Sequence, residues 1–151
     1  MKKIILLTAS FFIVLLANAQ LEIKNNTCVT ITVTSFCSDA TYTSCGSLES
    51  LGYTIPGYGS SQTVASPSSL NPFFTPPLNT YPPTYSIGSS SSFDAVKFSA
   101  NDGLGCYENV VVGGCGGLPT TFNGSCHFCG QQGLNATWVT VGSAIYVTIN
   151  N

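Results

Sequence analysis

The sequence predicts an all-β protein, an antiparallel β-sandwich of roughly eight strands stabilised by disulfide bonds. Several segments alternate apolar and polar residues with a period of two, as half-buried strands do. Turn-forming residues separate these segments at short intervals, which is typical of sandwiches. Seven cysteines follow an N-terminal export segment. No segment shows a sustained helical period or a repeat of 20–50 residues.

Residues 1–19 have the pattern of a removable signal peptide. Two lysines precede an apolar run, and a small-x-small cleavage motif ends at Ala19. A retained membrane anchor is the alternative, but small and hydroxylated residues interrupt the apolar run, which favours removal. We expect residues 20–151 to form a single domain with no membrane span. The expected location is secreted: extracellular, on the cell surface or in the periplasm.

The mature chain carries few charges. Lys24 and Lys97 stand against six acidic residues, a formal net charge of −4, and arginine is absent. Binding to nucleic acid requires a cluster of basic side chains that displaces counterions from phosphates. Two separate lysines do not form such a cluster. We therefore expect neither nucleic acid nor an anionic membrane as a partner.

The seven cysteines are expected to be bridged because an exported chain enters an oxidising compartment. Each bridge typically stabilises a fold by ~2–4 kcal/mol. One cysteine is left over, and it could be free, buried or bonded to a partner chain. The sequence does not determine the pairing. The candidates are Cys28, Cys37, Cys45, Cys106, Cys115, Cys126 and Cys129.

The first strands are expected at residues 21–24 and 28–36. In the second of these, Val29, Ile31 and Val33 face one way and the threonines between them face the other. A turn follows at residues 55–59, because Pro56 presets one dihedral angle and the adjacent glycine accepts a positive φ. Residues 61–65 are expected to form the next strand.

Residues 66–92 form a Pro/Ser-rich loop insertion in the expected domain. The segment holds six prolines, and proline lacks the N–H that a central strand donates, so loop or edge structure is expected. Its aromatic residues either pack onto the sheet or form an exposed contact surface. Packing is the favoured interpretation, because exposed aromatic clusters are unusual on monomers.

Two hairpins are expected in the second half of the chain. The first joins residues 93–100 to 106–112, and the second joins 136–141 to 144–149 through Gly142-Ser143. Glycine in the first turn position favours a type II′ turn. The register of the second hairpin predicts a core face made of Trp138, Thr140, Ile145, Val147 and Ile149.

Cys126-His127-Phe128-Cys129 is the most distinctive short motif. A redox pair would require a helix N-terminus that the glycine-rich surroundings do not provide. Zinc could be held by the two cysteines with His127, Cys115 or Cys106. Covalent haem attachment fails because glycine follows the second cysteine. Structural disulfides are the favoured interpretation, and we expect no metal and no cofactor.

Catalytic residues are not expected. His127 is the only histidine, so any Ser-His-Asp or Cys-His catalyst would depend on it, and no Gly-x-Ser-x-Gly motif occurs. Glycoside cleavage requires two carboxyl groups roughly 5–10 Å apart. Asp94, Asp102 and Glu108 lie on or beside one expected hairpin, but their spacing singles out no pair.

Two polar patterns remain. Thr30, Thr32 and Thr34 form a row of hydroxyls, which we interpret as an ordinary solvent-facing strand because neighbouring strands do not repeat it. Thr137 and Thr148 add only scattered copies. The N-glycosylation pattern Asn-x-Ser/Thr occurs at Asn25, Asn123 and Asn135.

The leading functional hypothesis is a secreted or surface-associated, non-catalytic binding or adhesion module that recognises a glycan or a protein. Phe73, Phe74 and Tyr81 are the candidate contact residues, because aromatic rings supply contact area at little rotamer entropy. One alternative is a structural subunit that assembles through strand edges or the unpaired cysteine. The other is a small secreted hydrolase built on His127 or on the Asp94, Asp102 and Glu108 carboxylates.

Overall fold

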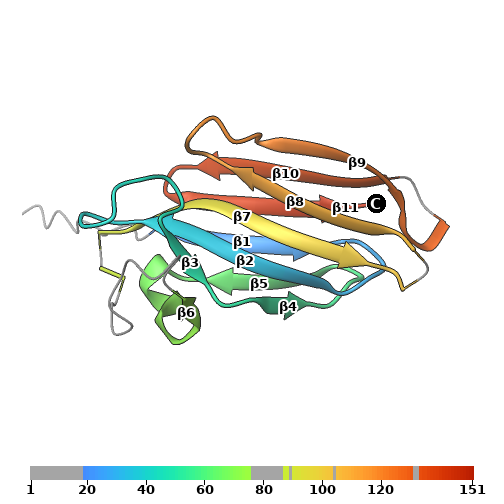
Figure 1. Ribbon diagram of the computed structural model, residues 1–151, viewed down its shortest axis with the longest axis horizontal. Coiled ribbons are helices and arrows are strands. Elements are labelled where there is room, and N and C mark those ends of the chain that lie inside the picture. Colours follow the sequence, from blue (N-terminus) through green and yellow to red (C-terminus); the bar gives the residue numbers. More distant parts are fainter. Residues whose placement is uncertain (1–18, 76–86, 89, 104, 131–132) are drawn as a thin grey trace, which may run out of the picture.

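The computed structural model describes residues 19–75, 87–88, 90–103, 105–130 and 133–151. These residues form two β-sheets that share one hydrophobic core (Figure 1). The expected disulfide-stabilised β-sandwich is therefore confirmed. Within this part of the chain no helix has the length and apolar character needed to cross a membrane. The expected signal peptide lies outside the described residues, apart from Ala19.

Sheet A has the strand order β5-β1-β11-β10-β9, and sheet B has the order β6-β3-β2-β7-β8 with β4 also paired to β2. Eight strands have five or more residues, which matches the expected number of strands. Three further strands in the described residues are only two or three residues long. The strands are β1 (Gln20–Asn25), β2 (Ile31–Ser38), β3 (Leu48–Ser50), β4 (Tyr53–Ile55), β5 (Ser60–Val64), β6 (Phe74–Thr75), β7 (Ser92–Asn101), β8 (Tyr107–Gly113), β9 (Thr121–His127), β10 (Gly133–Val141) and β11 (Ala144–Asn150), and the 3₁₀ helices are η1 (Pro67–Phe73) and η2 (Phe128–Gly130).

Strand β1 departs from the expected antiparallel pattern. It lies between β5 and β11, antiparallel to β5 and parallel to β11, with Ile23 opposite Val147 (Figure 1). The other strand pairs of the described residues are antiparallel. Alternation along a strand specifies which side chains are buried but not the direction of the neighbouring strand. The parallel pair was therefore not evident from the sequence.

Both expected hairpins are confirmed. Strands β7 and β8 pair from Ala95 opposite Gly113 to Asn101 opposite Tyr107. Strands β10 and β11 pair with Trp138 opposite Val147, as the sequence register predicts. Gly142 has a φ of +62° and Ser143 has no positive φ, which is the combination of a type II′ turn.

The core combines apolar side chains from the facing surfaces of both sheets. Its largest fully buried members include Phe98 from β7 and Phe128 from η2. Trp138, Ile145, Val147 and Ile149 of the second hairpin belong to it, as expected, whereas Thr140 near the hairpin turn is exposed. In β2 the expected alternation holds from Ile31 onward, where the strand begins.

The Pro/Ser-rich insertion is partly described. Residues 67–73 form η1, and β6 adds a two-residue edge strand to β3. Leu70 of η1 is buried in the core, as is Ile87 at the far end of the segment. For Phe73 and Phe74 the structure describes only the backbone, and Tyr81 lies outside the described residues. The proposed role of these three side chains stays a prediction.

Candidate functional site

Three disulfides connect six of the seven cysteines, as expected: Cys28–Cys129, Cys45–Cys115 and Cys106–Cys126. The two cysteines of the Cys-x-x-Cys motif therefore belong to two separate bridges, which is the interpretation that the sequence favoured. They do not pair with each other as a redox couple would. Cys45 and Cys115 also lie close to the Asp94 carboxylate, but their sulfurs are already bonded to each other.

Cys37 is the unpaired cysteine, and it is fully buried on the inner face of β2. Burial, with smaller contributions from the negative charges of Asp94 and Asp39, raises the pKa of its thiol from 9.0 to about 12. A neutral, inaccessible thiol is a poor nucleophile. A bridge to a partner chain through Cys37 would require the fold to open.

Cys37 should resist alkylation in the native protein. At pH 8 we expect iodoacetamide to leave it unmodified, and to add one label once guanidinium unfolds the chain with its disulfides intact. Because the thiolate is disfavoured only in the folded state, the free energy of unfolding should fall as pH rises from about 9 to about 12. Mass spectrometry of the labelled protein tests the first expectation, and labelling of native protein at the unfolded rate would contradict it.

The three carboxylates considered for hydrolysis have structural partners. Asp94 accepts hydrogen bonds from the Gly46 N–H at 2.8 Å and the Ser38 hydroxyl at 3.0 Å. Asp102 accepts the Cys106 N–H at 3.1 Å within the β7–β8 turn. Glu108 lies opposite Ala100, six residues along β7 from Asp94, so about 20 Å separates these two positions. The structure does not bring Asp94 and Glu108 together as a catalytic pair.

Glu108 connects the two sheets at one edge of the sandwich. Its Oε1 accepts the N–H groups of Ser125 and Cys126 in β9, each at 3.1 Å. The Cys106–Cys126 bridge joins the same edge. Strand β9 was not predicted, because its inward-facing residues are only half-buried and give no strong apolar alternation. His127 is the last residue of β9 and is exposed.

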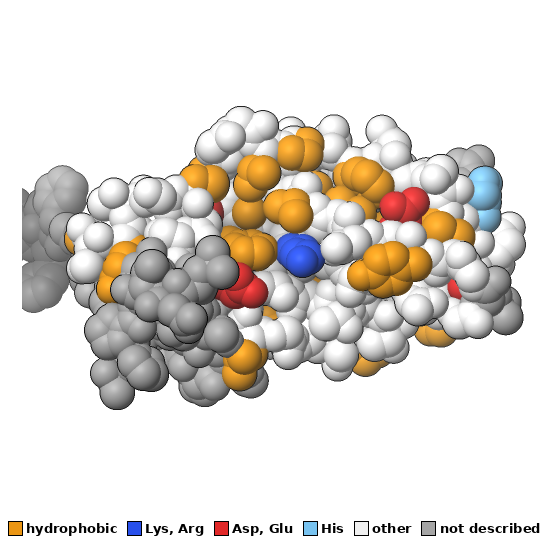
Figure 2. Space-filling view, viewed as in Figure 1, with side chains coloured by type: hydrophobic (Ala, Val, Ile, Leu, Met, Phe, Trp, Pro, Cys, Tyr) orange, Lys and Arg blue, Asp and Glu red, His pale blue; other side chains and the backbone are white. Residues whose placement is uncertain are grey.

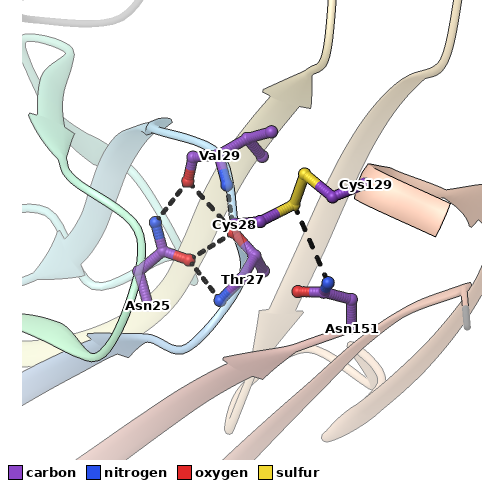
Figure 3. The surroundings of a disulfide bond; sticks show 6 residues. All are labelled: Asn25, Thr27, Cys28, Val29, Cys129 and Asn151. Atoms are coloured by element: carbon purple, nitrogen blue, oxygen red, sulfur yellow. Dashed lines mark hydrogen bonds between the residues drawn. A yellow bond between two sulfur atoms is a disulfide. The ribbon is translucent and has the colours of Figure 1, made fainter. Parts of the chain in front are cut away.

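Asn25 is the last residue of β1, and its side chain organises the loop that follows (Figure 3). It is fully buried, and its Oδ1 accepts the backbone N–H and the hydroxyl of Thr27 at 3.1 and 2.7 Å. Its amide group donates to the carbonyl oxygens of Val29, Ile55 and Pro56 at 2.8–3.1 Å. One side chain therefore joins the β1–β2 loop to the β4–β5 turn. Asn25 also begins an N-glycosylation pattern, but its side chain is buried and is used in these hydrogen bonds. Of the other two asparagines with this pattern, Asn123 is exposed and Asn135 is half-buried.

The β4–β5 turn is fastened to the same loop. The Tyr58 N–H donates to the Thr27 carbonyl at 2.7 Å, and the Gly59 N–H donates to the Asn25 carbonyl at 2.9 Å. A Cβ at Gly57 would lie 2.5 Å from the Thr27 oxygen, so this glycine is required for close approach. The positive φ angles fall on Tyr58 and Gly59, and not on Gly57 as the sequence suggested.

Tyr58 is held in a costly conformation and displayed to solvent. Its φ is +60°, in the left-handed region, which costs a residue with a Cβ roughly 1–2 kcal/mol. Its side chain is 85% exposed. Strained backbone of this kind clusters at functional sites. The sequence predicts the turn at residues 55–59, but it does not predict that the Tyr58 ring is exposed to solvent there.

Tyr58 borders a cavity of about 400 Å³ at this end of the sandwich, which we call the end pocket. Cys129, with a φ of +51°, is the other described non-glycine residue of positive φ, and it also lines the pocket. The Asn151 Oδ1 is buried with no hydrogen-bond partner, and its Nδ2 lies 3.8 Å from the Cys28 sulfur (Figure 3). The lining residues are Asn26, Cys28, Tyr58, Cys129 and Asn151.

Two further cavities lie elsewhere. One of about 320 Å³ runs between β4 and β5, where the Tyr53 hydroxyl points inward and bonds Ser35 at 2.7 Å. The other, about 380 Å³, lies on the outer face of sheet B and is mostly apolar, with Phe36 and Val111 in its lining. Figure 2 shows hydrophobic side chains gathered over β7 and β8 on this face. Among the described residues that line these two cavities, no non-glycine residue has a positive φ and no buried side-chain polar atom is without a hydrogen-bond partner.

Comparisons with protein-family models, with curated proteins and with solved structures find no match to this chain. The fold defines the chain as a disulfide-stabilised β-sandwich. The end pocket is its best-supported candidate site.

Proposed function

We propose that the protein is a secreted or surface-associated, non-catalytic binding module that recognises a neutral glycan at the end pocket. The expected signal peptide and the three disulfides support a location outside the cytosol. Loops at the end of a β-sandwich are a common place for recognition, because the sheets hold them rigidly.

The observation that carries the proposal is the display of Tyr58. Two backbone hydrogen bonds, from the N–H groups of Tyr58 and Gly59, hold the turn in a conformation that tyrosine rarely adopts. An exposed, rigid aromatic ring can stack against the C–H face of a sugar and loses little rotamer entropy on binding. Burying such a ring against a ligand would offset the cost of the strained turn.

The rest of the lining suits hydroxyl groups. Asn26 and Asn151 carry amides, which both donate and accept hydrogen bonds. The unpartnered Asn151 Oδ1 requires a donor, and leaving a buried acceptor unsatisfied costs roughly 1–3 kcal/mol. A sugar hydroxyl can supply that donor. Among the residues that the structure describes, no acidic or basic side chain lines the pocket, so a neutral ligand is favoured over a charged one.

A glycan fits this pocket better than a protein surface does. Protein interfaces bury an apolar centre surrounded by a polar rim. The end pocket is lined by amides and a disulfide around a single aromatic ring. The structural roles of Asp94, Asp102 and Glu108 further support recognition without bond cleavage.

Replacing Tyr58 by alanine should weaken glycan binding by about tenfold or more, which corresponds to at least roughly 1.4 kcal/mol. A screen of immobilised neutral glycans followed by calorimetry with the best ligand gives the measurement. Tyr58→Phe should retain most of the affinity because the ring remains. Tyr107→Ala is the matched control, since this tyrosine is also exposed but lies on β8 and does not line the pocket. Equal binding by Tyr58→Ala and wild-type protein would refute the proposal.

A further inference from the structure

We infer that the glycan is an extended neutral chain, which runs from the end pocket across the outer face of sheet A. This inference rests on the proposed function and names the kind of glycan. It depends on the polar side chains that the fold aligns on β11, β10 and β9.

Four asparagines line up across the sheet beside the pocket, and we call them the amide row. Asn26 lines the pocket, and its Nδ2 donates to the Asn150 Oδ1 at 2.8 Å. Asn150 is the register partner of Asn135, which is in turn the partner of Asn123. The row therefore leads away from the pocket across three neighbouring strands.

Three threonines form a second row next to the first. Thr148 of β11 lies opposite Thr137 of β10, which lies opposite Thr121 of β9. Thr137 and Thr148 seemed scattered in the sequence, but the sheet places them side by side. Each of these threonines is two residues from an asparagine of the amide row, so the two rows share the outer face.

The surface formed by the two rows has little charge. Strands β9, β10 and β11 contain no lysine, arginine, aspartate or glutamate. The charged side chains on the outer face of the described part of sheet A are Glu22 and Lys24, both on β1. A neutral array of hydroxyls and amides complements an uncharged polyhydroxylated chain and provides no attraction for a polyanion.

The spacing and orientation of the amide row suit such a chain. Neighbouring strands lie about 4.8 Å apart, close to the length that one pyranose unit adds to an extended β-linked polysaccharide. From Asn26 to Asn123 the row covers three such steps, or about 14 Å. The Asn135 Nδ2 donates to the Gly133 carbonyl at 2.9 Å, which orients its Oδ1 as an acceptor. The amides are thus partly ordered before a ligand binds.

The test is the dependence of affinity on chain length. We would titrate the mature protein with neutral β-1,4-linked glucose, mannose and xylose oligosaccharides of one to six units, and with heparin as a polyanion. For the best neutral series, affinity should rise with each unit up to about four, the number that the pocket and the row accommodate at strand spacing. Heparin should not bind.

The double variant Asn135→Ala/Thr137→Ala should lose the gain in affinity with length and keep the affinity for the shortest ligand. Thr32→Ala/Ser99→Ala is the matched control, because these residues form an outward-facing pair on sheet B. Affinity that does not depend on length, or a length dependence unchanged in the Asn135/Thr137 variant, would overturn the inference. If Tyr58→Ala still weakens binding by about tenfold or more in that case, the proposed function stands without the inference. If none of these oligosaccharides binds at any length, the inference fails, and if no glycan of the neutral screen binds either, the proposed function fails with it.

Discussion

Replacing Asn25 by alanine should lower the free energy of unfolding by on the order of 4 kcal/mol, because it leaves several buried polar groups without partners. The carbonyl oxygens of Ile55 and Pro56 would lose their donor, and the Thr27 N–H would lose its acceptor. The side chain is fully buried, so water cannot easily replace it. Urea unfolding followed by tryptophan fluorescence gives the measurement.

Asn26→Ala is the matched control for this experiment. Asn26 is the adjacent asparagine, but it is exposed and its side chain donates a single hydrogen bond, to Asn150. Its replacement should change the free energy of unfolding by less than about 0.5 kcal/mol, as is usual for surface substitutions. Equal effects at the two positions would show that the Asn25 hydrogen bonds do not hold the loop and the turn together.

The three disulfides should contribute to stability in the order of the loops that they close. The bridges Cys28–Cys129, Cys45–Cys115 and Cys106–Cys126 span 101, 70 and 20 residues. In the chain-entropy account, each bridge present on its own should stabilise the fold by about 4.7, 4.4 and 3.3 kcal/mol respectively, because these loop lengths apply to a chain with no other bridge. Variants that keep a single bridge, unfolded in guanidinium without reductant, would measure the differences between these contributions.

The longest and shortest loops give the clearest comparison. The variant that keeps only Cys28–Cys129 should be more stable than the variant that keeps only Cys106–Cys126 by about 1.4 kcal/mol. A reversed order would mean that native contacts around the bridges outweigh the restriction of the unfolded chain. A Cys28→Ala/Cys129→Ala variant should also bind glycan more weakly, because this bridge forms part of the end pocket.

The parts of the fold that could be predicted are those coded by local pattern. The β10–β11 hairpin is an example, because Gly142 selects the turn and the turn sets the register that buries Trp138. The alternation in β2 likewise predicts which of its side chains face the core. An export pattern with seven cysteines predicts three disulfides and one unpaired thiol.

The candidate site could not be predicted in the same way. The sequence indicates Phe73, Phe74 and Tyr81 in the Pro/Ser-rich insertion as contact residues, and no sequence pattern singles out Tyr58. Tyr58 matters because long-range hydrogen bonds hold its turn against the β1–β2 loop. Asn151 reaches the pocket only because β11 pairs in parallel with β1.

Local features of the chain were thus enough to establish its class, its hairpins and the buried face of its strands, since these depend on side-chain period and turn chemistry within a few residues. The disulfide partners, the parallel β1–β11 pair, the β9 edge and the end pocket depend on contacts between residues far apart in sequence. Such contacts form only when the whole core assembles, because the loss of chain entropy on closing long loops is recovered by burial in the complete sandwich.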